Sequence, residues 1–175
     1  KNTMRILKPF FFLFILISLN AKAQEVDFTE EVSEYLDRNG TMNQYQYAYD
    51  ELLKMLEKQY PKSDNTANGW EYLEDHREKA INEMKAGLTP IYQQNFTQGD
   101  IKAMNTFYQS DTGKQLVTDR SQMTEVQKQE LNTFYNSEVG KKIIEKQPIL
   151  TTEISKVSEN WSRDLYGTAK SLLNN

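Results

Sequence analysis

The sequence has no cysteine and only one histidine among its 175 residues, together with four prolines and seven glycines. Without cysteine the chain can form no disulfide, no thiolate nucleophile and no cysteine-ligated metal site, so packing alone must stabilise the fold. A single histidine excludes the two-histidine H-E-x-x-H zinc motif. The residues three and four positions from this histidine, His76, include no carboxylate. We therefore expect no metal, no other cofactor, and an ordinary helix-surface position for His76.

Positive charge is also scarce once the start of the chain is set aside. The sequence has 21 basic and 25 acidic residues, a net charge of −4, and its first 23 residues contain four of the basic residues and no acidic one. Without those residues the net charge is −8. A negative surface repels phosphate backbones and anionic lipid head groups. Nucleic acids and membrane surfaces are therefore not expected as partners.

The first 23 residues follow the three-part pattern of a secretory signal. A basic start precedes the apolar run "PFFFLFILISL", and the small-x-small sequence "AKA" follows. The run is shorter than the roughly 20 residues of a membrane-spanning helix. We predict cleavage near Ala23, contact with the membrane only before that cleavage, and a periplasmic or secreted protein. The remaining residues, 24–175, have the length of a single domain.

Residues 24–175 have the apolar periodicity of helices, which predicts an all-α bundle of about six to eight helices. Gly40 is expected to end the first helix in a left-handed conformation. Residues 60–69, "YPKSDNTANG", read as a loop. The helical pattern then continues from Trp70 as far as Pro90, which suits the first turn of a new helix. The two clearest apolar stripes are Tyr45, Tyr49, Leu52, Leu56 and Tyr60, and Leu150, Ile154, Val157, Trp161, Leu165, Ala169 and Leu172.

The role of three closely spaced tyrosines, Tyr45, Tyr47 and Tyr49, can be interpreted in two ways. They could form an aromatic platform for a ligand, or they could belong to the helix that carries them. Because Tyr45 and Tyr49 share the apolar stripe, core packing is the favoured interpretation.

One unit occurs twice, as "TQGDIKAMNTFYQSDTGKQLV" in residues 97–117 and "TEVQKQELNTFYNSEVGKKII" in residues 124–144. Each copy starts with a threonine that has an acidic or amide residue three positions later, a pattern close to the capping box. A serine in the middle of each copy suits the N-cap of a second helix. The sequence therefore predicts a tandem repeat of helix, tight corner and helix.

The shared motif F-Y-x-S-x-x-G-K supplies the candidate functional residues. We predict that phenylalanine fills the core, serine caps the second helix, glycine allows close backbone approach and lysine is solvated. The ten residues are Phe107, Tyr108, Ser110, Gly113 and Lys114 in the first copy, and Phe134, Tyr135, Ser137, Gly140 and Lys141 in the second.

Two catalytic interpretations of the same motif are weaker. A phosphate-binding G-x-x-x-x-G-K-[ST] loop would need glycine at Tyr108 and Tyr135, and a hydroxyl residue directly after each lysine. A serine–lysine dyad would need a free hydroxyl and a desolvated lysine, whereas a capping serine is engaged and its lysine lies beside an acidic residue. We therefore expect no catalytic residues and no enzyme activity.

The chain resembles the exported bacterial proteins of domain of unknown function 2059. The resemblance rests on "LTPIYQQNFTQGDIKAMNTFYQSDTGKQL" and "FYNSEVGKKIIEKQPILTTEISKVSENW", and it covers most of residues 88–170. Family members usually have one F-Y-x-S-P-x-G-K unit, whereas this chain has two, with Asp111 and Glu138 in place of the proline. The resemblance implies an all-helical protein of Gram-negative bacteria and leaves the molecular function open.

These observations favour a non-catalytic interaction module that binds another envelope protein or a second copy of itself. The alternative is a carrier that holds a lipid or another small hydrophobic ligand in a cavity between helices.

Overall fold

A computed structural model describes residues 27–174, and the predicted signal peptide, residues 1–23, lies outside them. The described residues contain an N-terminal helix over 27–38, seven further α-helices, one 3₁₀ helix and no strand. The predicted all-α fold with six to eight helices is confirmed. The elements after the first helix are α2 (Thr41–Gln59), α3 (Ala67–Asp75), α4 (Arg77–Asn95), α5 (Gln98–Gln109), α6 (Asp111–Asp119), η1 (Arg120–Gln122), α7 (Glu125–Asn136) and α8 (Glu138–Leu173).

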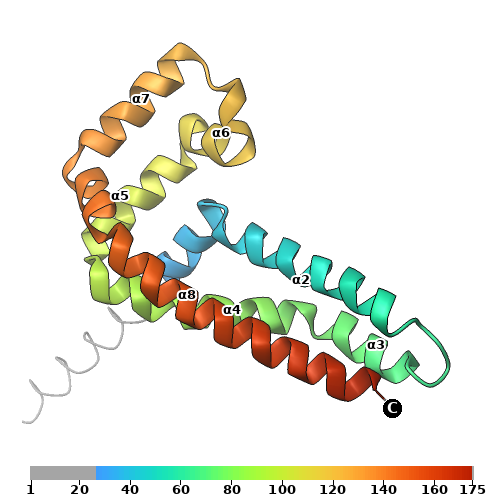
Figure 1. Cartoon of the computed structure of the whole chain (residues 1–175). Helices are drawn as coiled ribbons and strands as arrows, with labels where there is room; N and C mark the ends of the chain where they lie inside the picture. The colour runs from blue at the N-terminus through green and yellow to red at the C-terminus, as the bar shows by residue number, and fades with distance from the viewer. Residues whose placement is uncertain (1–26, 175) are drawn as a thin grey trace, which may run out of the picture.

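The helices form a long bundle with the repeat units at one end (Figure 1). The repeat-unit end contains α5, α6 and α7. Along the rest of the bundle, α2, α4 and the C-terminal part of α8 run side by side. Helix α8 is 36 residues long and belongs to both parts. It runs antiparallel to α4, since Trp161 donates its indole N–H to the Ala80 carbonyl at 2.9 Å while Val157 lies against Gly87. No helix in the described part of the chain has the length and apolarity to cross a membrane.

Gly40 ends the first helix as predicted. Its φ of 82° is left-handed, a conformation that glycine adopts without steric cost. A Cβ atom there would also lie 2.9 Å from a methyl carbon of Val117 in α6. Glycine therefore permits both the sharp entry into α2 and the close approach of α6.

The predicted helix start at Pro90 is wrong, because Pro90 lies inside α4. The ring removes one backbone hydrogen bond, which by itself disfavours a helix interior. On either side Leu88 is fully buried and Ile91 is 7% exposed, so continued packing of this face outweighs the local cost. Thr89 does not cap a new helix and instead donates its hydroxyl to the Lys85 carbonyl at 2.9 Å.

The helical pattern from Trp70 to Pro90 is interrupted at His76, which separates α3 from α4. His76 therefore lies at a helix junction and not in the middle of a helix surface. The loop predicted for residues 60–69 is shorter than expected, since α3 already begins at Ala67. Gly69 lies within α3, and glycine there allows the close approach of α8, since a Cβ atom would lie 2.8 Å from the Leu172 carbonyl oxygen.

The two tyrosines predicted to lie on the apolar stripe of α2, Tyr45 and Tyr49, pack in the core. Tyr49 is 1% exposed and donates its hydroxyl to the Leu73 carbonyl at 2.6 Å. Tyr45 packs edge-on against Trp161, with 5.7 Å between ring centroids. Tyr47 points away from this face and is 66% exposed. The core interpretation is thus confirmed for Tyr45 and Tyr49.

Removal of one buried hydroxyl tests this packing. Tyr49→Phe should lower the free energy of unfolding by about 0.5–1.5 kcal/mol, because the Leu73 carbonyl loses a hydrogen bond. Tyr47→Phe is the matched control and should change it by less than about 0.5 kcal/mol. Urea unfolding measures both, and equal stabilities for the two variants would contradict the role given to the Tyr49 hydroxyl.

Candidate functional site

Each repeat corner is held by one serine hydroxyl that serves two helices. Ser110 Oγ donates to the Phe107 carbonyl at the end of α5 (2.6 Å) and accepts from the Gly113 N–H at the start of α6 (3.1 Å). Ser137 makes the same two bonds between α7 and α8, at 2.6 and 3.2 Å. Helix ends leave backbone groups unpaired, and a side chain that satisfies one of each kind joins the two helices without a loop. The predicted capping role of both serines is confirmed.

The motif glycines lie against the backbone of the preceding helix. A Cβ atom at Gly113 would lie 2.2 Å from the Phe107 carbonyl oxygen and 2.6 Å from Tyr108 Cα. At Gly140 the matching oxygen, that of Phe134, would also lie 2.2 Å away. Real Cβ atoms do not approach so closely, so the predicted need for glycine is confirmed in both copies.

Both copies also begin with the predicted capping box. Thr97 and Asp100 exchange side-chain and backbone hydrogen bonds at the start of α5, and Thr124 and Gln127 do so at the start of α7. Asp100 forms an ion pair with Lys142 of the second copy. Burial raises the pKa of Asp100, but the hydrogen bonds from Lys142 and Thr97 outweigh it and hold that pKa below its ordinary value.

The motif lysines lie on the surface. Lys114 and Lys141 are both exposed, and neither forms an ion pair with another described residue. The hydroxyls four residues earlier are already engaged in capping. These positions do not form the free hydroxyl and buried amine that a serine–lysine dyad requires.

The prediction that both phenylalanines fill the core holds only in part, because Phe134 packs against the main core cluster as a partly buried residue and Phe107 does not belong to that cluster. Phe107 and Phe134 are only partly buried, and they stack on each other with centroids 4.0 Å apart and planes 9° apart. The two copies thus meet through equivalent residues. Parallel stacking at this distance joins the repeats to each other. The fully buried side chains of α5 are those of Ile101 and Met104.

The motif tyrosines lie on the inner side of the corners. Tyr108 packs edge-on against Tyr35, with 5.8 Å between centroids, and Tyr35 packs in the same way against Tyr92. Burial, followed by the neighbouring phenols of Tyr35 and Tyr135, raises the pKa of Tyr108 far above its ordinary value. The Tyr108 phenol therefore stays neutral and cannot act as an anionic base near neutral pH.

A groove of about 460 Å³ opens between the start of α2 and α6. It is lined on one side by Asn39, Gly40, Asn43, Gln44 and Tyr47 and on the other by Tyr108, Leu116 and Val117. The last three come from the first repeat copy. The groove was not predicted from the sequence because its two walls are distant in the chain. The spacing of Asn43, Gln44 and Tyr47 does indicate an exposed face of α2, which is one of the walls.

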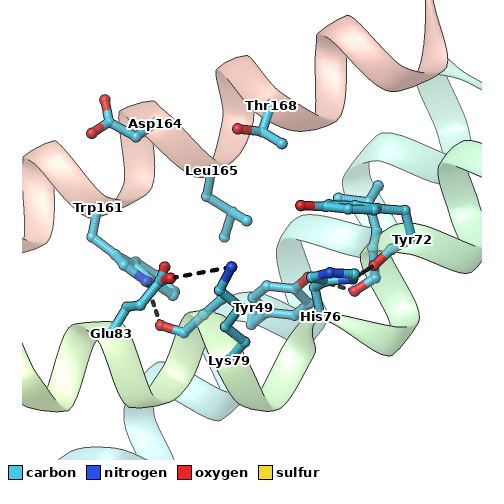
Figure 2. A pocket seen from close by; sticks show the side chains of 11 residues that line it. Tyr49, Tyr72, His76, Lys79, Glu83, Trp161, Asp164, Leu165 and Thr168 are labelled. Atoms are coloured by element: carbon cyan, nitrogen blue, oxygen red, sulfur yellow. Dashed lines mark hydrogen bonds and ion pairs between the residues drawn. The ribbon is translucent and has the colours of Figure 1, made fainter.

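A second, smaller cleft of about 220 Å³ lies between the α3–α4 junction and α8 (Figure 2). The ring of His76 stacks on that of Tyr72 at 3.7 Å, and its Nδ1 donates to the Tyr72 carbonyl at 2.8 Å. Leu165 points from α8 toward α4, and the Lys79 and Glu83 side chains lie 3.8 Å apart at the rim. No cluster of metal-ligating side chains occurs among residues 27–174.

The corner glycines can be tested with alanine. Gly113→Ala and Gly140→Ala should each lower the free energy of unfolding by about 1–3 kcal/mol through overpacking against the preceding carbonyl. Gly167→Ala is the matched control, because a Cβ at this position of α8 meets nothing within 4 Å. That control should stabilise the protein by about 0.5–1 kcal/mol. Urea unfolding followed by circular dichroism measures all three, and stabilisation at the corners would contradict the close approach.

The serine and lysine roles make a second prediction. Ser110→Ala and Ser137→Ala should each destabilise by about 0.5–2 kcal/mol through loss of the cap. Lys114→Ala and Lys141→Ala should stay within about 0.5 kcal/mol, as exposed substitutions usually do. Thermal melting measures the four variants. A lysine variant that melts like the parent but abolishes partner binding would show that the motif is more than a folding unit.

Comparison with known proteins identifies one family. The family described as "Uncharacterized protein conserved in bacteria (DUF2059)" matches the chain twice, over residues 82–126 and 120–166. No curated protein and no solved structure matches the chain. The first match contains the corner at Ser110 and the second contains the corner at Ser137, in agreement with the duplicated unit. The chain therefore belongs to this bacterial family, domain of unknown function 2059, and carries its unit in two consecutive copies.

Proposed function

We propose that the protein is an exported, periplasmic interaction module that binds another envelope protein through the groove between α2 and α6. The observation that carries the proposal is the composition of this groove, where the first repeat copy and an exposed face of α2 meet. Its volume of about 460 Å³ is comparable to that of a small-ligand pocket, so it can take in only a few side chains of a partner protein. Tyr47, 66% exposed at its edge, belongs to a residue type enriched in protein interfaces.

Export is supported by the basic, apolar and small-x-small sequence order of residues 1–23. The absence of cysteine suits an exported protein whose fold does not depend on oxidation. The predicted net charge of −8 after cleavage favours neutral or basic partners over nucleic acid.

A lipid carrier is the weaker proposal. The cleft between α4 and α8 has only about 220 Å³, which is below the usual range for ligand pockets. Between the main helices, Leu36, Leu88 and Ile101 are fully buried and fill the space that a lipid chain would need. A catalytic role is also weaker, because the motif hydroxyls are engaged in capping.

Site-specific photo-crosslinking tests the module. A benzophenone amino acid at Tyr47, in protein expressed in its bacterial host, should crosslink to one defined envelope protein. The same amino acid at Tyr72, which is 40% exposed in the other cleft, is the matched control and should not crosslink to that protein. Adding Gln44→Arg to the Tyr47 derivative should reduce the crosslink, because the new charge lies inside the groove.

The same samples report the other parts of the proposal. Crosslinked chains should come from the periplasmic fraction and start at Gln24. Equal crosslinking from both positions, or no crosslink together with a lipid retained in native mass spectrometry, would overturn the module in favour of nonspecific contact or of the carrier.

A further inference from the structure

We infer that Arg38 is the positioning residue of the groove between α2 and α6, because its guanidinium joins the two helix ends from which the walls of the groove start. The inference rests on the proposed function and names the residue that controls the separation of the two walls. It is carried by the juxtaposition of Arg38, at the end of the N-terminal helix 27–38, with Asn105 and Gln109 near the end of α5.

Each wall of the groove starts directly from a helix end. The wall formed by α2 begins at Gly40, which follows the N-terminal helix after a single residue. The wall formed by α6 begins at the corner where Ser110 bonds the last turn of α5 and the first turn of α6. Neither connection is a long loop. The separation of the walls therefore follows from the position of the end of the N-terminal helix relative to the end of α5.

Arg38 bonds these two helix ends to each other. Its Nη1 donates to Asn105 Oδ1 at 3.1 Å and, within its own helix, to Glu34 Oε2 at 2.6 Å. Gln109 accepts from Nη1 and Nη2 at 3.0 and 3.1 Å in the amide orientation that gives both of its amide atoms suitable partners. Asn105 and Gln109 are four residues apart and share one face of α5. The planar guanidinium thus binds one face of α5 at two points.

These bonds lie at the base of the groove. Arg38 directly precedes Asn39, a residue of the α2 wall, and Gln109 directly follows Tyr108, a residue of the opposite wall. A movement of either helix end would therefore move the wall attached to it.

Two further contacts show which movement Arg38 opposes. Val117 of α6 packs against Gly40 at one end of the groove, so the walls cannot come closer there. Asn105 is 6% exposed, and its Nδ2 donates to the Glu31 carbonyl at 2.9 Å. Without Arg38 the buried Oδ1 of Asn105 would lose its partner, which is costly. Packing at Gly40 thus limits closure of the groove, and Arg38 limits its opening.

A distance measurement across the groove tests the inference. The chain has no cysteine, so Asn43→Cys combined with Thr118→Cys would place one nitroxide label on each wall and none elsewhere. Both residues are exposed. Double electron–electron resonance on the exported form of the protein should give one narrow distance distribution. The same labels in Arg38→Met should give a broader distribution shifted to longer distances.

Two variants separate positioning from stability and from charge. Arg77→Met is the matched control, since the Arg77 side chain is 28% exposed, against 30% for Arg38, and donates twice to Asp50 within the bundle. This variant should keep the parent distribution. Arg38→Lys keeps the positive charge beside Glu34 but lacks the planar fork. It should therefore broaden the distribution as Arg38→Met does. Circular dichroism checks that each variant is folded.

Three outcomes would overturn the inference: a parent-like distribution in Arg38→Met, equal broadening in Arg77→Met, or full restoration by Arg38→Lys. The proposed function can fail separately. Arg38→Met should weaken the crosslink from Tyr47 as the groove opens. If the distance grows and the crosslink is unchanged, the groove is not the binding surface and the module fails, while the role of Arg38 stands. If the parent forms no crosslink, the distances still decide the role of Arg38.

Discussion

The contact on which the rest of the structure depends is the approach of each motif glycine to the carbonyl that ends the preceding helix. At Gly113 there is no room for a Cβ atom, which would lie 2.2 Å from the Phe107 oxygen. The same oxygen accepts from the backbone N–H of Ser110 at 3.1 Å and from its hydroxyl at 2.6 Å. One carbonyl therefore ends a helix, orients the cap of the next one and sets the distance between them. Because the corner has no loop residues, the angle between the helices is fixed by hydrogen bonds.

Two such corners in one chain can meet face to face, and the stacked rings of Phe107 and Phe134 are that meeting point. Beyond it the copies differ in their surroundings. Asn105 of the first copy is buried, accepts from Arg38 at 3.1 Å and donates to the Glu31 carbonyl at 2.9 Å. The equivalent residue of the second copy, 27 positions later, is exposed. The N-terminal helix thus makes this hydrogen-bonded contact with the asparagine of the first copy and not with that of the second, so sequence similarity between the copies did not produce equal environments.

The local chemistry of this fold was predictable from sequence, and the long-range packing was not. Caps join residues three positions apart, so Ser110 and Thr97 could be assigned without knowledge of the fold. Pro90 was misassigned because burial on both sides of it depends on helices far away in the sequence. Phe107 was placed in the core because it is apolar, whereas its environment depends on its repeat partner. The groove was missed for the same reason, since its walls belong to residues about 70 positions apart.

The different fates of the two second helices explain why the groove exists. In the first copy the helix after the corner, α6, has nine residues and ends at Asp119, whose carboxylate accepts from the Ser121 N–H at 2.9 Å and starts the 3₁₀ turn. In the second copy the equivalent helix continues for 36 residues, because its apolar stripe packs along α4. The second copy therefore anchors the pair to the bundle. The first copy keeps a short helix whose Val117 side chain packs against Gly40 at the start of α2, and Leu116 and Val117 line the groove beside this contact. Duplication of one structural unit thus provides both an attachment to the bundle and one wall of the groove.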